Sequence, residues 1–344
     1  MQAKVGTYDT QEVKMKRHGN LFSKIADKEN IKLAHMNARK GKTFYKEVQD
    51  IDANIDKYVD EIHNMLVEGT YQVSEYKMFI KNDKGKIREI YKLDYYPDRI
   101  IHHAILQILE PIWKPMLIKN TYQSIKGRGV KACKRDVHKC IKEHKDTELW
   151  VLKLDIKKFY PSVDNEILKS IVSKKIKCKK TLELLYRIID SMRGLPIGNY
   201  ISQYLGNMYL MYLDQLIKSL PTTVGYFRYC DDIIVFSNSK DNIKEICVII
   251  TKYLERELKL SVKNNVQYFS LNKRPLDFVG YVFMSNGKVR LRSSIVKRMK
   301  NTLAENKTES VSAYYGWVLE SKAFGLWNKH YKGDKYGNKR SNWR

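Results

Sequence analysis

The sequence predicts an α+β fold centred on a ferredoxin-like sheet, and three observations support this prediction. Between residues 150 and 283 the expected elements follow the order strand, helices, hairpin, helix, strand, which is the split βαβ pattern. Residues 226–236 form an apolar and aromatic run that two adjacent carboxylates, Asp231 and Asp232, interrupt. With 344 residues, 43% of them hydrophobic, the chain can bury a large core and form two or more packed subdomains.

The N-terminal part is expected to be helical and basic. Apolar residues recur at helical spacing over residues 20–68, and residues 37–42 break the run. Residues 50–67 place their apolar side chains on one stripe, so we expect a single amphipathic helix there. Gly69 is expected to end it.

A hairpin is expected after these helices. Residues 76–80 and 87–91 alternate like two strands on either side of a turn at residues 82–85. Its basic side chains are Lys81, Lys84, Lys86 and Arg88. A solvated charged edge and a flap that grips phosphates both fit this pattern, and charge alone does not decide between them.

The rest of the chain alternates helices and strands. Helices are expected over residues 98–109, 164–175, 182–192, 202–216 and 240–258. A Lys-rich helix is expected after the Gly-rich segment 124–131 and should end at about residue 143. Strands are expected over residues 149–155, 259–263, 276–283 and 288–292, with a hairpin over 226–236. Residues 293–344 are expected to form a short, basic, helical appendage. The Gly-rich segment 124–131 lacks the G-x-x-x-x-G-K-[ST] phosphate loop, so it is weak support for nucleotide binding.

Composition restricts the function. Lys and Arg number 64 against 38 Asp and Glu, and the resulting charge of +26 predicts a nucleic-acid partner, although a Lys-rich proteome would explain part of the excess. The five cysteines include no C-x-x-C pair, which argues against zinc and disulfide frameworks. No signal core and no apolar run of about 18 residues is present, so we expect a cytoplasmic protein without a membrane partner.

The Asp pair is the strongest chemical signal. Two buried like charges are costly unless cations compensate them, so a hairpin carrying Asp231 and Asp232 at its turn favours a divalent metal site. A solvent-exposed turn is the alternative. Asp155 ends a neighbouring strand and supplies a third carboxylate, and three carboxylates on adjacent strands suit a two-metal site for phosphoryl transfer.

These motifs resemble those of reverse transcriptases. Residues 229–232 (Tyr-Cys-Asp-Asp) resemble the family's Tyr-x-Asp-Asp box, residues 154–161 its first palm motif and residues 278–281 its primer grip. The resemblance runs from about residue 20 to about residue 327. It implies a right-hand polymerase with basic fingers, a ferredoxin-like palm and a short helical thumb. The implied divisions are residues 1–148, 149–283 and 284–344, in that order.

The resemblance also implies residue roles. Asp155 and Asp231 match the principal metal ligands, and Asp232 matches the third carboxylate. The Ile156 carbonyl matches a metal contact. The implied cofactors are two Mg2+ ions, with Mn2+ as the alternative. The primer-grip residues are Phe278, Val279, Gly280 and Tyr281.

Other residues match the nucleotide site of the family. Tyr160 stands where reverse transcriptases keep an aromatic gate against the ribose 2′-hydroxyl, which implies deoxynucleotide substrates. Arg88 matches the finger arginine that holds the triphosphate, with Lys81 as its partner. Lys263 aligns with the lysine that protonates pyrophosphate.

One loop departs from the common pattern. Most reverse transcriptases carry Gln-Gly where this chain has Ile197 and Gly198, and the segment ends in Gln203. This form resembles the enzymes of diversity-generating retroelements, in which the change is linked to error-prone copying of template adenines. Ile197 cannot make the hydrogen bonds of a Gln. Defence-associated bacterial reverse transcriptases share the layout and are the alternative.

The implied partners are a template RNA, a primer or a structured non-coding RNA, deoxynucleotides, the cDNA product and an accessory protein. A non-catalytic RNA-binding scaffold would be expected to lack a carboxylate or the gate, yet all are present. A nucleotide cyclase or nuclease on a similar palm would not need Arg88, the gate and the primer grip together. Priming of cDNA synthesis from a protein hydroxyl is a further alternative.

Overall fold

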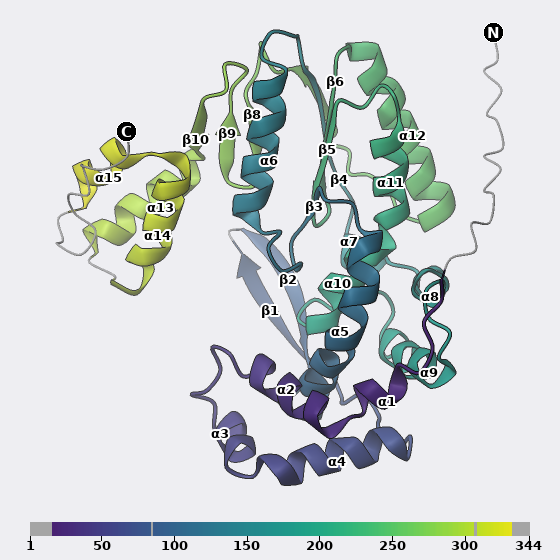
Figure 1. Ribbon diagram of the computed structural model, residues 1–344. Helices are drawn as coiled ribbons and strands as arrows, with labels where there is room; N and C mark the ends of the chain where they lie inside the picture. Colours follow the sequence, from purple (N-terminus) through teal and green to yellow (C-terminus); the bar gives the residue numbers. More distant parts are fainter. Residues whose placement is uncertain (1–15, 84, 306–307, 332–344) are drawn as a thin grey trace, which may run out of the picture. The chain divides into compact units, whose positions relative to one another are not determined.

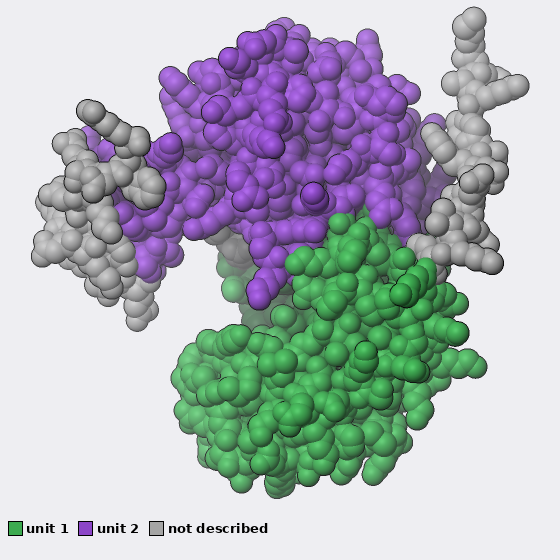
Figure 2. Space-filling model, viewed as in Figure 1, with its two compact units in different colours: residues 1–117, 158–211 green, residues 118–157, 212–344 purple. Residues whose placement is uncertain are grey.

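The computed structural model describes residues 16–83, 85–305 and 308–331. The chain divides into two compact units (Figure 2): unit 1 comprises residues 1–117 and 158–211, and unit 2 comprises residues 118–157 and 212–344. Lys84, the N-terminal residues before 16 and the basic tail after 331 lie outside the described residues. The division into fingers, palm and thumb at residues 148 and 283 stays a prediction.

Unit 1 begins with short helices (Figure 1). They are α1 Phe22–Ile25, α2 Lys28–Ala38, α3 Lys46–Ala53 and α4 Ile55–Val67. The side chain of Asp27 caps α2 by accepting a bond from the Asn30 N–H at 3.1 Å. The single helix expected over residues 50–67 is wrong: the backbone leaves helical geometry at Asn54 (φ −131°, ψ 40°), which separates α3 from α4.

The expected hairpin is confirmed as β1 Lys77–Asp83 and β2 Lys86–Lys92, an antiparallel pair in which Lys81 lies directly opposite Arg88. After the hairpin come η1 Tyr95–Arg99, α5 Ile100–Trp113 and η2 Lys114–Met116. The later helices of this unit are α7 Phe159–Ser162, α8 Asn165–Ser173, α9 Lys179–Ile189 and α10 Tyr200–Tyr209, followed by α11 Met211–Ser219, which leads into unit 2.

Unit 2 is organised around a five-stranded sheet. Its strands are β3 Thr121–Tyr122, β4 Trp150–Asp155, β5 Gly225–Tyr229, β6 Asp232–Ser237 and β7 Gln267–Ser270. They lie in the order β3-β5-β6-β4-β7. The pairs β5–β6, β6–β4 and β4–β7 are antiparallel, whereas β3 pairs with β5 in parallel. Four strands with helices between the first and second and between the third and fourth form the predicted split βαβ arrangement.

The last strand of that pattern lies later in the chain than the sequence predicts. The expected strand at residues 259–263 is wrong except for a single bridge between Val262 and Ile156, and the strand itself is β7. Lys259 adopts a left-handed conformation (φ 50°) where α12 Lys240–Leu258 ends, and the Leu260 N–H closes the helix end on the Leu254 carbonyl. The chain therefore needs several more residues before it pairs along β4.

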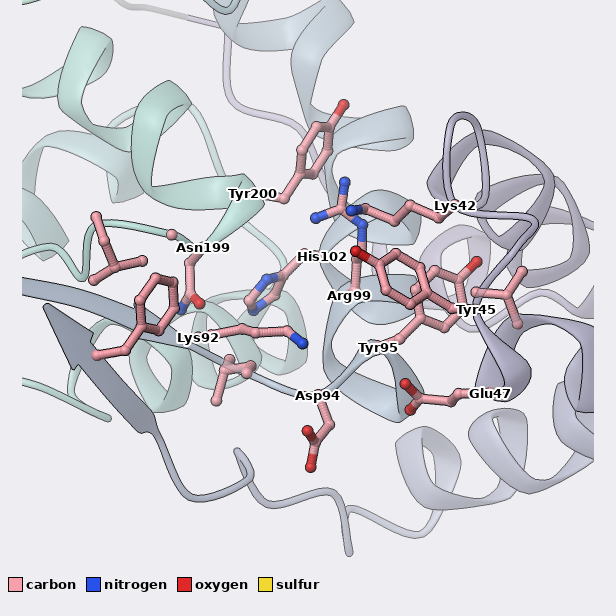
Figure 3. A pocket seen from close by; sticks show the side chains of 15 residues that line it. Lys42, Tyr45, Glu47, Lys92, Asp94, Tyr95, Arg99, His102, Asn199 and Tyr200 are labelled. Carbon is pink, nitrogen blue, oxygen red and sulfur yellow. The ribbon is translucent and has the colours of Figure 1, made fainter. Parts of the chain in front are cut away.

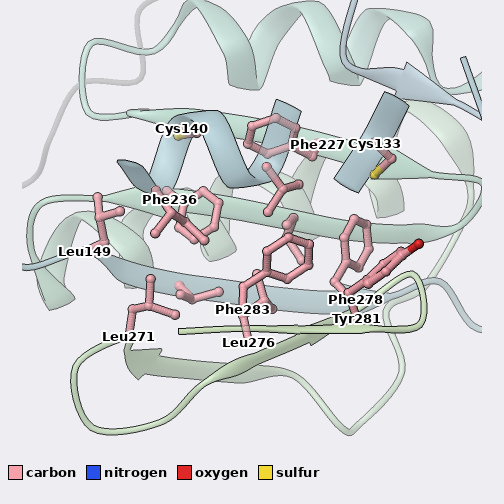
Figure 4. Packing of buried hydrophobic residues seen from close by; sticks show 14 of the residues in the cluster. Cys133, Cys140, Leu149, Phe227, Phe236, Leu271, Leu276, Phe278, Tyr281 and Phe283 are labelled. Atoms are coloured by element: carbon pink, nitrogen blue, oxygen red, sulfur yellow. The ribbon is translucent and has the colours of Figure 1, made fainter. Parts of the chain in front are cut away.

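Different elements pack against the two faces of this sheet. A cluster of buried apolar side chains joins α6 Val130–Glu143 and a second sheet to one face (Figure 4). This second sheet has the order β10-β9-β8, with β8 Leu276–Phe278, β9 Tyr281–Phe283 and β10 Val289–Leu291. Side chains alternate across a strand, so Ile234 and Phe236 join this cluster while Ile233 and Val235 point to the opposite face, where α12 packs against the sheet.

Three helices end the described part of unit 2: α13 Ser293–Ala304, α14 Thr308–Ser321 and α15 Phe324–His330. They share a small core of their own, in which Met299, Val318 and Trp327 are buried. None of the helices in the described ranges combines the length and apolar content that crossing a bilayer would require.

Candidate active site

Three carboxylates meet at one end of the unit 2 sheet. Asp155 is the last residue of β4 and lies directly opposite Asp232, the first residue of β6. Cross-strand partners project from the same face, so these two side chains share the face covered by α6 and β8–β10. Asp231 occupies the turn between β5 and β6, as expected.

The carboxylate of Asp155 has one cationic partner. Lys263 Nζ forms an ion pair with its Oδ2 atom, and the Lys263 N–H donates to the Asp155 carbonyl at 2.9 Å. The Lys157 N–H donates to the Ser261 carbonyl at 2.8 Å. Neither backbone bond uses the carbonyl of Ile156, the group expected to contact a metal.

Charge is not balanced at this site. Burial, the charge of Asp155 and a hydrogen bond to it, and the charge of Asp232 raise the pKa of Asp231 to about 6. The other oxygen of Asp155, Oδ1, is buried without a hydrogen-bond partner in the described structure. An unsatisfied carboxylate oxygen beside two further carboxylates is costly, and an added cation relieves that cost.

These residues fit a divalent cation by their chemistry, although they are not gathered around one point. Among the residues that the structure describes, no three His, Cys, Asp or Glu side chains form a group that could hold a metal ion as they stand. The Lys263 ammonium also takes an oxygen of Asp155 that a metal would use. Divalent ions prefer such carboxylate and carbonyl oxygens.

A buried ion pair supports the turn that carries Asp231. The guanidinium of Arg228, which has no exposed surface, donates to both carboxylate oxygens of Asp214, at 2.7 and 2.6 Å. Tyr226 and Thr121 also donate to Asp214, at 2.6 and 3.0 Å. The sequence did not reveal this network, because Asp214 sits inside an apolar helix whose partners are distant in sequence.

The expected primer-grip residues form the turn between β8 and β9. Phe278 and Tyr281 are each 1% exposed and belong to the buried cluster of Figure 4. Val279 (φ 45°) and Gly280 (φ 87°) make the turn, and the Arg292 N–H donates to the Gly280 carbonyl at 3.0 Å. Only the turn itself, not the two aromatic side chains, is therefore available to a ligand.

The remaining predicted site residues belong to unit 1. Lys81 and Arg88 are exposed cross-strand partners on one face of the β1–β2 hairpin. Like charges directly opposite each other destabilise a sheet. A polyanion placed on that face would remove the repulsion.

Backbone contacts fix the position of the loop that carries Ile197 and Gly198, where most reverse transcriptases have Gln-Gly. The Ile197 carbonyl accepts a bond from the Tyr91 N–H of β2 at 2.8 Å. Gly198 has a φ of 127°, and a Cβ atom there would lie 2.6 Å from the Tyr91 carbonyl oxygen, so only glycine fits. The Ile197 side chain is half-buried, and Gln203 is exposed on α10.

Tyr160 lies in the short helix α7. Its ring packs edge-on against Phe159, with centroids 5.2 Å apart, and its carbonyl accepts a bond from the Leu195 N–H at 2.8 Å. The residue expected to be the gate is thus tied to the same loop that carries Ile197.

A pocket in unit 1 adds residues that the sequence analysis missed (Figure 3). Lys42, Lys92 and Arg99 line a cavity of about 270 Å3, and burial, reinforced by the positive charges of Arg99 and Lys92, lowers the pKa of Lys42. Tyr200, 41% exposed, presents its ring beside Arg99. The segment 37–42 was not predicted to line a pocket, and its basic residues were the available signal.

A buried histidine also faces this pocket. Burial, reinforced by the charge of Arg99, lowers the pKa of His102 to about 4, and its Nε2 atom has no hydrogen-bond partner among the described residues. The pocket therefore offers three cations, exposed aromatic rings and one unpaired polar atom, a combination suited to a nucleotide.

The structure thus gathers the predicted residues into two groups. Unit 2 contains the metal and primer-grip candidates, which are Asp155, Ile156, Asp231, Asp232 and residues 278–281, together with one nucleotide-site candidate, Lys263. Unit 1 contains the nucleotide-site candidates, which are Lys81, Arg88, Tyr160, Ile197, Gly198 and Gln203. The roles of all of them stay predictions.

Comparisons with known proteins concern the family and the fold of the chain. The family model for reverse transcriptase (RNA-dependent DNA polymerase) matches residues 80–283, more than half of the chain. Protein YkfC of Escherichia coli (strain K12) is 22% identical over 300 residues, which cover 73% of this chain and 77% of YkfC. Group II intron-encoded protein LtrA of Lactococcus lactis subsp. cremoris is 21% identical over 330 residues, covering 74% of this chain but only 54% of LtrA.

A solved structure shows the same fold. The telomerase of Candida tropicalis, in complex with the TWJ fragment of telomeric RNA, superposes with a TM-score of 0.53 at 13% identity, over 82% of this chain and 60% of the telomerase chain. At this identity the likeness concerns the fold alone. Together with the family match it confirms the predicted right-hand polymerase fold class.

Proposed function

The chain belongs to the reverse transcriptase family, and from this premise we propose that it extends a primer on an RNA template by two-metal nucleotidyl transfer. The observation that carries the proposal is the carboxylate group at the end of the unit 2 sheet. Asp155 and Asp232 face each other across two strands, and Asp231 has its pKa raised beside them. Family members are expected to use divalent ions, and Mg2+ is the ion we propose, with Mn2+ as the alternative.

The metal ligands would be Asp155, Asp231 and the Ile156 carbonyl, with Asp232 as the third carboxylate. Two bound ions would favour deprotonation of the primer 3′-hydroxyl and would neutralise charge on the leaving pyrophosphate. In the structure Lys263 holds the oxygen of Asp155 that a metal would take. Once displaced, Lys263 is a suitable proton donor for the pyrophosphate.

The residues of unit 1 would hold the substrates. Lys81 and Arg88 would bind the triphosphate of the incoming deoxynucleotide, because their mutual repulsion is relieved by an anion. Tyr160 would exclude the ribose 2′-hydroxyl. The pocket beside the loop, with its cations and the exposed rings of Tyr45 and Phe79, would bind a nucleotide of the single-stranded template.

The primer would be positioned by unit 2. Because Phe278 and Tyr281 are buried, contact with the primer would come from the backbone of Val279 and Gly280. The two aromatic side chains would act by fixing the shape of this turn.

The biological role proposed is mutagenic copying, as in diversity-generating retroelements, and Ile197 at the nucleotide loop supports it. The alternative is a defence-associated enzyme that makes cDNA from a partner non-coding RNA. Sequencing the nucleic acid that copurifies with the protein separates the two, because copies of one variable gene segment would favour the first and one repeated non-coding RNA the second.

The test of the activity is primer extension by the purified protein with Mg2+, deoxynucleotides and a generic RNA template. Asp231→Ala should abolish cDNA synthesis while leaving affinity for the primer–template nearly unchanged. If the Asp231→Ala protein still makes cDNA, the metal assignment is wrong.

A further inference from the structure

A second basic cleft lies in unit 2, at the outer edge of its sheet. It is about 590 Å3 in volume and lies between α6 and the first residues of β5, near the short strand β3. Among its lining residues Arg135, Lys139 and Lys218 are exposed cations. None of the predicted metal, nucleotide-site or primer-grip residues lines this cleft, although Tyr226, which donates to Asp214, does.

The cleft carries a surplus of positive charge. Five of its lining residues are basic and two are acidic, namely Asp136 and Glu143. Both acids are already engaged: Asp136 accepts bonds from Tyr122 at 2.8 Å and from Arg135 at 3.0 Å, and Glu143 lies 3.7 Å from Lys139. Arg135 and Lys139 keep 72% and 71% of their side-chain surface exposed, so both remain available to an anion.

The chemistry favours contacts with phosphates over contacts with bases. The Tyr and Phe residues that line the cleft, Tyr122, Tyr226 and Phe227, are buried, with exposures of 0%, 2% and 3%. The ring of His144 also lines the cleft, but it is half-buried and its Nδ1 atom bonds to the Cys140 carbonyl at 2.9 Å. Single strands are recognised largely by stacking of bases on exposed rings, whereas RNA duplexes are bound by shape and backbone. This distinguishes the cleft from the pocket of unit 1, which is lined by the exposed rings of Tyr45 and Phe79.

The position of the cleft excludes the reacting nucleotide as its ligand. Gly225 and Phe227 belong to the beginning of β5, and the catalytic turn follows its end at Tyr229. At roughly 3.3 Å per residue, Gly225 lies roughly 20 Å along the chain from Asp231. A ligand in the cleft and a primer terminus at the carboxylates would therefore be bound separately.

We propose that this cleft binds the phosphate backbone of a folded, double-stranded element of a partner RNA, outside the path of the primer and template. The choice of RNA as the polyanion rests on the proposed function. Binding there would tether a structured RNA to the polymerase while its single-stranded part is copied.

The experiment measures anisotropy of a fluorescein-labelled RNA hairpin of about 20 base pairs, on full-length protein saturated with unlabelled preannealed primer–template. Arg135→Gln, Lys139→Gln and Lys218→Gln are combined in a cleft variant. The control variant combines Lys244→Gln, Lys252→Gln and Arg256→Gln, which removes three exposed charges from α12 on the opposite face of the same sheet.

The wild type and the control variant should bind the hairpin in the presence of primer–template. The cleft variant should bind about 10-fold more weakly, and the slope of log affinity against log salt should fall by about 3, or about 0.9 per lost phosphate contact. Extension of the preannealed primer should be unchanged. If no protein extends the primer and only the cleft variant loses the hairpin, the cleft assignment stands and the proposed function fails.

Three results would overturn the assignment. Equal weakening by both variants would mean a general electrostatic field, and full displacement of the hairpin by primer–template would mean one shared site. Tighter, cleft-dependent binding of a deca-glutamate peptide would indicate an acidic protein partner instead. Both variants must melt at the same temperature as the wild type for the comparison to be valid. If the triple cleft variant does not fold, the single substitution Lys139→Gln replaces it.

Discussion

Arg228 donates a hydrogen bond to the carbonyl oxygen of Cys230, at 2.9 Å, and so fixes the residue that precedes Asp231. Cys230 adopts a left-handed conformation (φ 60°), which is unusual for a residue other than glycine. The guanidinium that holds it is itself fixed by both carboxylate oxygens of Asp214. A fully buried ion pair thus determines where the turn presents its carboxylate.

We predict that Arg228→Lys slows primer extension far more than it weakens primer–template binding. A lysine keeps the charge but cannot contact both Asp214 oxygens and the Cys230 carbonyl at once. Loss of these contacts should cost roughly 2 kcal/mol of folding free energy. The measurement is kcat, the primer–template Kd and a urea melt.

Arg228→Met provides the stronger perturbation for comparison. It leaves the Asp214 charge buried without a partner and should destabilise the protein by about 3–5 kcal/mol. An Arg228→Lys protein with wild-type kcat would show that the turn does not depend on this side chain.

The carboxylate site also predicts a pH dependence of stability. Because the pKa of Asp231 rises from its ordinary value near 3.8 to about 6 in the folded protein, the folded state holds the proton more tightly than the unfolded state. Stability of the metal-free protein should therefore fall as pH rises from about 4 to about 6 and then level off. Asp231→Asn removes this penalty.

We expect Asp231→Asn to stabilise the metal-free protein by about 2 kcal/mol above pH 6, a free energy that is discounted for the partial exposure of Asp231. The same substitution should have little effect on stability near pH 3.5. Thermal melts with EDTA over this pH range measure it. The matched control is Asp241→Asn, at an exposed carboxylate on α12. A stabilisation that does not change with pH would contradict the charge explanation.

Much of this site could be predicted from the sequence, because its signals are local. Asp155 ends a strand-like run, and the pair Asp231 and Asp232 interrupts another, so alternation alone places them at strand ends. The pocket around Lys42 and Arg99 could not be found this way, since its members come from separate helices, a strand and a loop. The ion pair of Asp214 and Arg228 was missed for the same reason.

Errors in the fold arose where a single residue changes the backbone direction. Asn54 interrupts a stripe whose apolar spacing continues unbroken through it, so periodicity predicted one helix where there are two. Beyond α12, the apolar residues 260 and 262 look like part of a strand, but only Val262 pairs, in a single bridge with Ile156 just after β4. The hydrophobic pattern indicates which residues are buried, but at these positions it does not determine which strands pair or where a helix ends.

The β8–β9 turn yields a third prediction. A Cβ atom at Gly280 would lie 2.8 Å from both Ile295 Cδ1 and the Trp317 ring, and its φ of 87° disfavours any side chain. Gly280→Ala should therefore destabilise the protein by about 2 kcal/mol or more and weaken primer binding. Gly316→Ala is the control, because nothing lies within 4 Å of a Cβ there.

In the control, alanine within α14 should be neutral or stabilising by up to about 1 kcal/mol. Urea melts of both variants and primer-binding titrations make the comparison. If Gly280→Ala melts like the wild type, the turn is able to move away from Trp317 and is not the rigid element inferred here.

The loop at Ile197 gives the prediction that bears on biological role. We expect the wild type to misincorporate mainly opposite template adenine, and Ile197→Gln to reduce those errors several-fold, because the amide restores hydrogen bonds near the nucleotide. The loop should keep its position in this variant, since its backbone carbonyl is bonded to Tyr91 and the side chain takes no part in that bond. Sequencing of cDNA made on a defined template counts the errors at each base. Gly198→Ala separates shape from chemistry: its Cβ would meet the Tyr91 carbonyl at 2.6 Å, so it should lower the extension rate on all four bases alike. Wild-type errors spread evenly over the four template bases would rule out an adenine-specific role for Ile197.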